Sequence, residues 1–281
     1  MKIEQAVEKA KKRIAERGGG SDVETVRNLR TAPAAQENWN PPVYAQSQPR
    51  VLDARKLSAN RCVCFRDDAA EMDYYKMLRT QIVQQAQAKG WNTFMVTSTR
   101  PGEGKTLTSI NLAMTFARTF NHTVLLMDCD LRQQKIFRYL GIEGSKGIAD
   151  HLAGEVPLKE IIVWPGIDKM SLISGGRTFN ESAELLGSPR MKSLIQEMKA
   201  RYPDRYILID APPVLSGPDA LLLSTLADGI VMVVESGKTA LKEIEEALAL
   251  MPAEKFLGFV LNRHRAENKG YYNYYSSARQ R

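Results

Sequence analysis

The segment Ser98-Thr99-Arg100-Pro101-Gly102-Glu103-Gly104-Lys105-Thr106 follows the apolar run 94–96 and precedes a stretch in which apolar residues recur at helical spacing. A glycine-containing loop between a strand and a helix is the context of a phosphate-binding loop. Its glycines let the backbone curl until N–H groups converge on phosphate oxygens, and the dipole of the following helix adds positive potential. Thr99 stands where the strict pattern has glycine, so the prediction depends on Gly-x-Gly-Lys-Thr and its position after a strand.

This loop predicts nucleotide binding. Lys105 is expected to reach the β- and γ-phosphates of ATP, and the Thr106 hydroxyl is expected to bind Mg²⁺. The predicted nucleotide-binding residues of the loop are Gly102, Glu103, Gly104, Lys105 and Thr106. The alternative is a glycine-rich turn beside an unrelated lysine, and two acidic motifs further along the chain argue against it.

Both acidic motifs place carboxylates directly after an apolar run. Asp128 and Asp130 follow one run, and Asp210 follows another. If these runs are parallel strands, the carboxylates lie at the edge of the sheet where α/β proteins bind ligands. Asp128 and Asp130 are predicted to hold Mg²⁺ and to accept a hydroxyl proton. Asp210 is predicted to bind the metal, because a rigid strand aims its carboxylate at that site. The alternative for Asp128 or Asp130 is solvation of a strand end or capping of a helix.

Apolar runs alternate with helix-like segments from about residue 71 onward. The predicted strands are residues 93–98, 123–128, 170–174, 206–210, 229–235 and 256–262. The predicted helices include residues 71–88, 106–119, 183–201 and 239–250. This alternation predicts an α/β fold that is P-loop NTPase-like, with a mostly parallel sheet and helices on both faces.

The chain divides into four predicted regions. Residues 1–17 have the spacing of an amphipathic helix, which either docks on a partner or membrane surface or remains a solvated tail helix. Residues 18–70 are rich in glycine, proline and polar residues and predict a flexible linker. Residues 71–269 form the P-loop domain, and residues 270–281, GYYNYYSSARQR, predict a tail without a core pattern.

The composition excludes several protein classes. The chain has 281 residues and a net charge of +7, which permits an anionic partner; a nucleotide is favoured over nucleic acid. Cys62, Cys64 and Cys129 have neither the number nor the spacing of a disulfide framework or a zinc site. The sequence has no apolar stretch of about 20 residues for a membrane span and no signal peptide, so a cytoplasmic protein is expected.

The motifs together resemble those of a known family. GEGKT at 102–106, LLMDCDLR at 125–132, ILIDAPP at 207–213 and a terminal tyrosine cluster are similar to the motifs of bacterial tyrosine kinases of the exopolysaccharide and capsule type. The chain looks closest to the soluble autokinases associated with exosortase systems. The resemblance implies an enzyme that transfers the γ-phosphoryl group of ATP to tyrosines in its own tail and thereby regulates exopolysaccharide biosynthesis or export.

The resemblance also implies roles for individual residues. The implied catalytic residues are Lys105, Asp128, Asp130 and Asp210, and the implied metal ligands are Thr106, Asp128 and Asp210. Asn262 is implied to lie near the adenine, and the implied phosphoacceptors are Tyr271, Tyr272, Tyr274 and Tyr275. The alternative for the tail is that its aromatic residues stack on RNA, bind a membrane interface or pack on the body of the protein.

Assembly and partners are implied in the same way. Members of the family carry an acidic-x-x-basic-x-x-Arg helix for ring assembly, and Asp73, Lys76 and Arg79 hold these positions here. Lys76 cannot make the forked contacts of an arginine. The resemblance implies a homo-oligomer, a separate membrane activator of the chain-length-regulator type and a tyrosine phosphatase. The activator would hold the protein at the inner face of the membrane.

Two other functions stay open from the sequence. A partition or cell-positioning ATPase with a deviant Walker motif would be a nucleotide-switched dimer. That group has a lysine five residues before the P-loop lysine, and here that residue is Arg100. The tyrosine-rich tail and the pair Asp128 and Asp130 favour the kinase. The third function is a catalytically weak scaffold in which ATP holds an oligomer together.

Overall fold

The computed structural model describes residues 48–264, except for residues 51, 67, 68, 70, 120, 145, 180 and 203. The predicted N-terminal helix 1–17, most of the predicted linker and the tail 270–281 therefore lie outside the described residues. No helix within the described part of the chain is long and apolar enough to cross a membrane.

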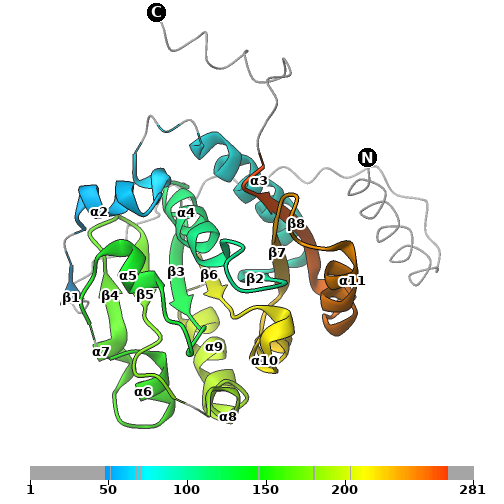
Figure 1. Cartoon of the computed structure of the whole chain (residues 1–281). Coiled ribbons are helices and arrows are strands. Elements are labelled where there is room, and N and C mark those ends of the chain that lie inside the picture. The colour runs from blue at the N-terminus through cyan, green and yellow to red at the C-terminus, as the bar shows by residue number, and fades with distance from the viewer. Residues whose placement is uncertain are drawn as a thin grey trace, which may run out of the picture.

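An eight-stranded sheet forms the centre of the protein (Figure 1). Its strands are β1 (Gln48–Pro49), β2 (Thr93–Ser98), β3 (Thr123–Asp128), β4 (Ile162–Trp164), β5 (Met170–Ile173), β6 (Arg205–Asp210), β7 (Gly229–Glu235) and β8 (Phe256–Asn262). Their order across the sheet is β1-β4-β5-β3-β6-β2-β7-β8, and only the pair β4 and β5 is antiparallel. The prediction of a mostly parallel α/β sheet is confirmed. The short strands β1 and β4 were not predicted.

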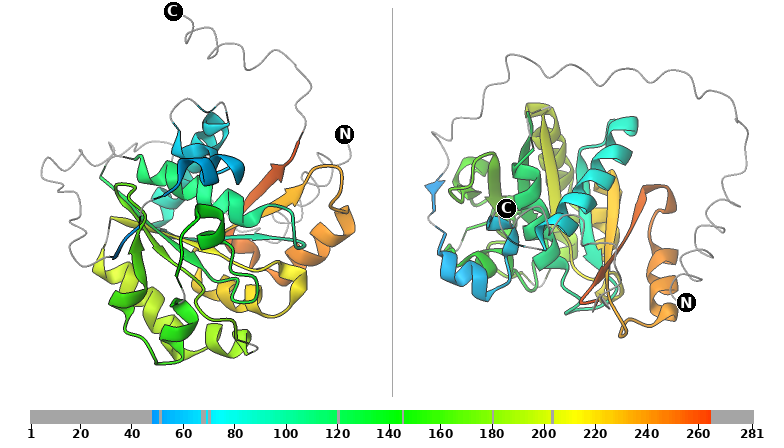
Figure 2. Two further views of the ribbon diagram at one scale, coloured as in Figure 1. Left: turned by 60° about the vertical axis from the view of Figure 1, so that its left-hand side comes forward. Right: turned by 90° about the horizontal axis from the view of Figure 1, so that it is seen from above.

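Helices cover both faces of the sheet (Figure 2). One face packs against α2 (Ala54–Ala59), α3 (Met72–Lys89), α4 (Lys105–Ala117) and α5 (Ile136–Leu140). The other packs against α6 (Ile148–Leu152), α7 (Leu158–Ile161), α8 (Ser182–Leu186), α9 (Pro189–Arg201), α10 (Asp219–Leu226) and α11 (Leu241–Leu250). Three 3₁₀ turns, η1 (Val63–Phe65), η2 (Val214–Ser216) and η3 (Ala253–Lys255), complete the elements.

The continuous apolar runs of the sequence follow from this two-sided cover. In β2, Phe94 and Val96 belong to the core on one face, and Met95 belongs to the core on the other. Every residue of β2, β3 and β6 is buried. Strands buried on both faces have no reason to alternate apolar and polar residues.

The single helix predicted for residues 183–201 is wrong, because the structure has two helices there. The chain leaves α8 at Gly187, and α9 begins anew at Pro189. The Ser188 hydroxyl accepts a hydrogen bond from the Met191 N–H at 3.2 Å and so caps the second helix. A proline at the first helical position after a serine cap is a favourable helix start.

The flexible linker predicted for residues 18–70 ends earlier than predicted. Asp53 caps α2 by accepting a hydrogen bond from the Arg55 N–H at 2.8 Å. Leu57, Cys62 and Cys64 are buried in the core beside α4. The sequence did not predict that this segment packs against the core, because its polar composition resembles that of a linker. Its few apolar side chains find their partners only in the folded chain.

Candidate active site

The three predicted motifs come together because their strands are neighbours. Strand β6 lies between β3 and β2, and all three run in parallel (Figure 1). Asp128 of β3 and Val96 of β2 are both in register with Asp210 of β6. The phosphate-binding loop that follows β2 therefore lies beside the acidic carboxyl ends of β3 and β6.

The loop between β2 and α4 requires its two glycines. Gly102 has φ +88° and Gly104 has φ +99°, the left-handed region that favours glycine. A Cβ atom at Gly104 would lie 2.1 Å from the Asn262 amide nitrogen. Asn262 closes over the loop by donating a hydrogen bond to the Glu103 carbonyl at 2.7 Å. The Glu103 carboxylate accepts hydrogen bonds from the Arg100 N–H and from the Thr239 hydroxyl, which holds the loop from the other side.

Lys105 lies at the centre of the acidic cluster. Its ammonium group is 2.7 Å from Asp130 Oδ2 and 3.9 Å from Asp210 Oδ1. Burial by itself would lower the pKa of Lys105, but the carboxylates of Asp210 and Asp130 outweigh burial and raise the pKa. The lysine is therefore held as a buried cation at the first turn of α4.

Asp210 combines complete burial with an unsatisfied oxygen. Its Oδ1 accepts a hydrogen bond from the Ser109 hydroxyl at 3.1 Å. Within the described part of the chain its Oδ2 has no hydrogen-bond partner, although the Thr106 hydroxyl lies near enough to favour the charged form. Burial, with repulsion by Asp130, raises the pKa of Asp210 despite Lys105. A bare carboxylate oxygen beside a hydroxyl and a phosphate-binding loop suits a hard cation with oxygen ligands.

Asp128 and Asp130 occupy different environments. Asp128 is buried, and its two oxygens accept hydrogen bonds from the N–H groups of Asp130 at 3.3 Å and Ile136 at 3.0 Å. Burial and repulsion by Asp210 raise the pKa of Asp128 to about 7. Asp130 lies in the loop beyond β3, where its Oδ1 also accepts a hydrogen bond from the Gln133 N–H at 3.2 Å.

A cleft of about 540 Å³ lies over these groups. The predicted site residues that line it are Gly102, Gly104, Lys105, Thr106, Asp130 and Asn262. Asp130 is the member of the acidic pair that lines the cleft, and Asp128 lies outside the lining.

Comparison with known proteins identifies the family. A family model described as an AAA domain matches residues 92–253. Tyrosine-protein kinase YwqD of Bacillus subtilis is 32% identical over 208 residues, which are 73% of this chain and 86% of YwqD. The chain belongs to the bacterial tyrosine-protein kinase family. It is therefore a tyrosine kinase, and the predictions of the family and of the enzyme class are confirmed.

Solved structures support the same assignment. The kinase domain of the Escherichia coli tyrosine kinase ETK matches with a TM-score of 0.63 at 25% identity, over 71% of this chain and 80% of that domain. The septum site-determining protein MinD of Pyrococcus horikoshii, complexed with Mg-ADP, matches with a TM-score of 0.53 at 26% identity, over 63% of this chain and 72% of MinD. The kinase thus has a P-loop NTPase-like fold that binds nucleotides.

Some relatives are much longer than this kinase. One of them is named "Putative tyrosine-protein kinase EpsB", from Ralstonia nicotianae, and is 34% identical over 64% of this chain. The chain spans 24% of EpsB.

Several lining residues of the kinase were missed by the sequence analysis. They are Asn60, Arg61, Gln133, Lys135, Tyr139 and Arg263. Asn60 and Arg61 come from the segment predicted as linker, and no motif marks them. Arg263 and Lys135 follow predicted strand-end motifs, so their positions next to Asn262 and near Asp130 were the only signal available.

The side chains predicted as oligomer contacts form bonds within the kinase's own chain. Asp73 and Lys76 form an ion pair of 3.2 Å within α3. Arg79 donates a hydrogen bond to the Thr115 carbonyl of α4 at 2.8 Å, and burial lowers the pKa of Arg79. The tail tyrosines Tyr271, Tyr272, Tyr274 and Tyr275 lie outside the described residues.

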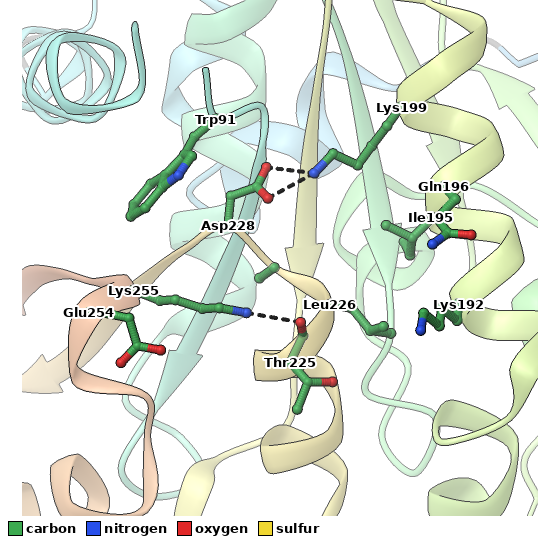
Figure 3. A pocket seen from close by; sticks show the side chains of 11 residues that line it. Trp91, Lys192, Ile195, Gln196, Lys199, Thr225, Leu226, Asp228, Glu254 and Lys255 are labelled. Carbon is green, nitrogen blue, oxygen red and sulfur yellow. Dashed lines mark hydrogen bonds and ion pairs between the residues drawn. The ribbon is translucent and has the colours of Figure 1, made fainter. Parts of the chain in front are cut away.

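A second pocket of about 380 Å³ lies near the first residues of β2, β7 and β8 (Figure 3). There Lys199 and Asp228 point toward one another and form hydrogen bonds of 2.8 and 2.9 Å. The Asp228 carboxylate also accepts hydrogen bonds from the N–H groups of Asn92 and Thr93. Lys255 donates to the Thr225 carbonyl at the end of α10. These polar groups satisfy one another, which is typical of a structural junction.

The Asp228→Ala variant is expected to unfold more easily and to keep its kinase activity. The substitution leaves Lys199 and the N–H groups of Asn92 and Thr93 without their acceptor, which should lower the free energy of unfolding by about 2 kcal/mol. Chemical denaturation measures this change. Glu254→Ala in the same pocket is the control, with an expected change within about 0.5 kcal/mol. Loss of kinase activity in folded Asp228→Ala would show that this pocket takes part in the reaction.

Proposed function

We propose that this kinase is an ATP-dependent autokinase that transfers the γ-phosphoryl group of ATP to tyrosines of its own C-terminal tail. The observation that carries the proposal is the convergence of Lys105 with the carboxylates of Asp130, Asp210 and Asp128 beside the phosphate-binding loop. The proposed acceptors are Tyr271, Tyr272, Tyr274 and Tyr275.

Lys105 is proposed to exchange partners when ATP binds. In the structure its ammonium group donates a hydrogen bond to Asp130 Oδ2. The phosphate oxygens of ATP compete for this cation, since a multiply charged phosphate attracts the ammonium group more strongly than one carboxylate. Lys105 then binds the transferred phosphoryl group, and Asp130 Oδ2 becomes free to accept a proton.

Asp130 is proposed to take the tyrosine proton. The tyrosine Oη forms a bond to the γ-phosphorus while the bond from that phosphorus to the β–γ bridging oxygen breaks, and ADP leaves. The Oη proton passes to the carboxylate of Asp130, the acidic residue that lines the cleft. Asp128 supports this residue, because its carboxylate binds the Asp130 N–H and shapes the loop.

Thr106, Asp128 and Asp210 are proposed to hold Mg²⁺. The unpartnered Oδ2 of Asp210 and the nearby Thr106 hydroxyl fit a hard cation, and each Asp128 oxygen keeps a second lone pair beyond its backbone hydrogen bond. When bound, Mg²⁺ neutralises charge on the phosphates. Asn262 is proposed to lie beside the adenine, because it closes over the loop and lines the cleft.

The proposal includes assembly and regulation that rest on the family resemblance. Neighbouring copies would associate through Asp73, Lys76 and Arg79, for which Arg79 retains N–H donors beyond its bond to Thr115. A separate membrane activator would dock the kinase at the inner face of the membrane, a tyrosine phosphatase would reverse the modification, and the pathway controlled would be exopolysaccharide biosynthesis or export.

Replacing all four tail tyrosines with phenylalanine is expected to abolish phosphotyrosine and to leave ATP affinity unchanged. Phenylalanine lacks the acceptor oxygen, while the cleft is untouched. The measurement is incubation with Mg²⁺ and γ-labelled ATP, followed by mapping of labelled residues by mass spectrometry. Tyr74→Phe, at an exposed tyrosine of α3, is the control that should retain the label. Undiminished label in the fourfold variant would refute the tail as acceptor.

A positioning ATPase is the second candidate, and the likeness to MinD favours it. Arg100 stands at the position of the lysine typical of that group, but it forms an ion pair with Glu243 of α11. In the same labelling experiment, release of free phosphate without any labelled tyrosine would favour this candidate over the kinase acting on its tail.

A further inference from the structure

The backbone of Arg61 adopts a conformation that normally belongs to glycine. Arg61 follows the end of α2 with φ +58°. Its N–H donates to the Ser58 carbonyl at 3.0 Å, and the Cys62 N–H donates to the Leu57 carbonyl at 2.9 Å. This pair of bonds is the Schellman motif, in which the left-handed position is usually glycine because a Cβ atom is strained there. A large side chain at this position suggests that the side chain itself is needed.

The turn that carries Arg61 is attached to the helix of the phosphate-binding loop. The side-chain amide of Asn111, in α4, donates to the carbonyls of Arg61 at 3.1 Å and Leu107 at 3.0 Å. The Asn111 side-chain oxygen accepts the Cys64 N–H at 2.9 Å. Asn60 donates to the Tyr139 carbonyl at 2.8 Å. Arg61 is thus fixed relative to the first turn of α4, which also carries Lys105 and Thr106.

Arg61 supplies uncompensated positive charge to the cleft. Among the cations that line the cleft, Lys105 is paired with Asp130, and Arg263 is paired with Glu235 at 2.8 Å. Lys135 donates to the neutral side chain of Gln133. The side chain of Arg61 is exposed, and its guanidinium group forms no ion pair or hydrogen bond with any residue that the structure describes. The excess charge of the cleft therefore comes from Arg61 and Lys135, which suits an anionic ligand with several phosphates.

We propose that Arg61 is a nucleotide-binding residue whose guanidinium group binds the polyphosphate of ATP in this cleft. It supplements the backbone N–H groups of the loop with a charge-assisted, forked contact. The segment before α3 would then be part of the ATP site and not a spacer. This inference rests on the proposed function, because it assumes that ATP occupies the cleft.

The Arg61→Gly variant separates the side chain from the backbone. Glycine adopts the φ of this position without strain, so the melting temperature of the nucleotide-free protein should be unchanged or higher. The dissociation constant for Mg²⁺-ATP, measured by titration calorimetry, should rise about tenfold with loss of a charged contact at an exposed site. The decrease of affinity with salt should also become less steep. Arg61→Lys should lose less affinity for Mg²⁺-ATP than Arg61→Gly, because lysine keeps the charge and lacks only the forked contact.

Asn121→Gly is the matched control. Asn121 has φ +57°, and it does not line the cleft. This variant should gain stability in the same way as Arg61→Gly and bind ATP as the unsubstituted kinase does. ATP affinity in Arg61→Gly equal to that of the control would overturn the inference. Absence of ATP binding by the unsubstituted kinase would instead refute the proposed function, so the two failures are distinguishable.

Discussion

Lys105→Met is expected to abolish tyrosine phosphorylation, with a loss of rate of at least about 10³-fold. Methionine keeps an unbranched side chain that is one atom shorter, and it removes the only cation within 4 Å of both Asp130 and Asp210 in the described part of the chain. The developing charge on the transferred phosphoryl group then loses its nearest counter-charge from the protein. The measurement is incorporation of label from γ-labelled ATP into tyrosine under single-turnover conditions.

The same substitution is expected to destabilise the nucleotide-free kinase by about 3 kcal/mol, because it leaves buried carboxylates without their partner. Lys242→Met is the control. The Lys242 side chain is 86% exposed, and its ion pair with Glu246 is long, at 3.8 Å. That control should retain activity and stability. Persistent phosphotyrosine in Lys105→Met would refute the assignment of the catalytic lysine.

Asp210→Asn is expected to remove activity and to spare stability. We expect a loss of phosphoryl-transfer rate of at least about 10²-fold, the scale of a single electrostatic contact, and loss of the Mg²⁺ dependence of ATP affinity. The asparagine oxygen can still accept the bond from Ser109. Since the folded protein raises the pKa of Asp210, the ionised carboxylate is less favourable in the folded chain than in the unfolded one. The neutral amide removes that unfavourable contribution, so the melting temperature should be equal or higher.

Asp150→Asn provides the contrasting control. Asp150 is buried as well, but its carboxylate binds the Arg177 guanidinium and the Gly147 N–H. Burial alone would raise the pKa of Asp150, yet these bonds lower it, so ionised Asp150 stabilises the fold. Asp150→Asn should therefore lower the melting temperature and leave kinase activity intact. If Asp210→Asn behaved in the same way, the carboxylate of Asp210 would be a structural group.

The motifs were predictable because the chemistry of each is local in the chain. Gly104, Lys105 and Thr106 are consecutive residues, and a strand before them and a helix after them are enough to aim the loop. The long, continuous apolar runs of β2, β3 and β6 predicted a sheet covered on both faces. The fold class, the family and the enzyme class could therefore be predicted from the sequence.

The unpredicted features depend on contacts that exist only in the folded chain. Strand β1 has two residues and takes its place by pairing with the distant strand β4, where Gln48 is in register with Val163. The roles of Asp128 and Asp130 looked alike from their spacing, but the N–H of Ile136 binds Asp128 while Asp130 lines the cleft. No periodicity distinguishes the two carboxylates, because the difference is made by the path of the loop after β3.

By itself, the sequence determined the alternating α/β pattern, the phosphate-binding loop and the carboxylates at the strand ends, since each of these depends on neighbours within a few residues. Only the tertiary structure decided which groups share the cleft. Arg61 is separated from Lys105 in the chain by η1, α3 and β2, and it enters the site because Asn111 holds its turn against α4. Burial likewise decided the pKa of Asp128 and left Asp210 Oδ2 without a partner among the described residues, because desolvation is a property of the packed chain and not of the residue.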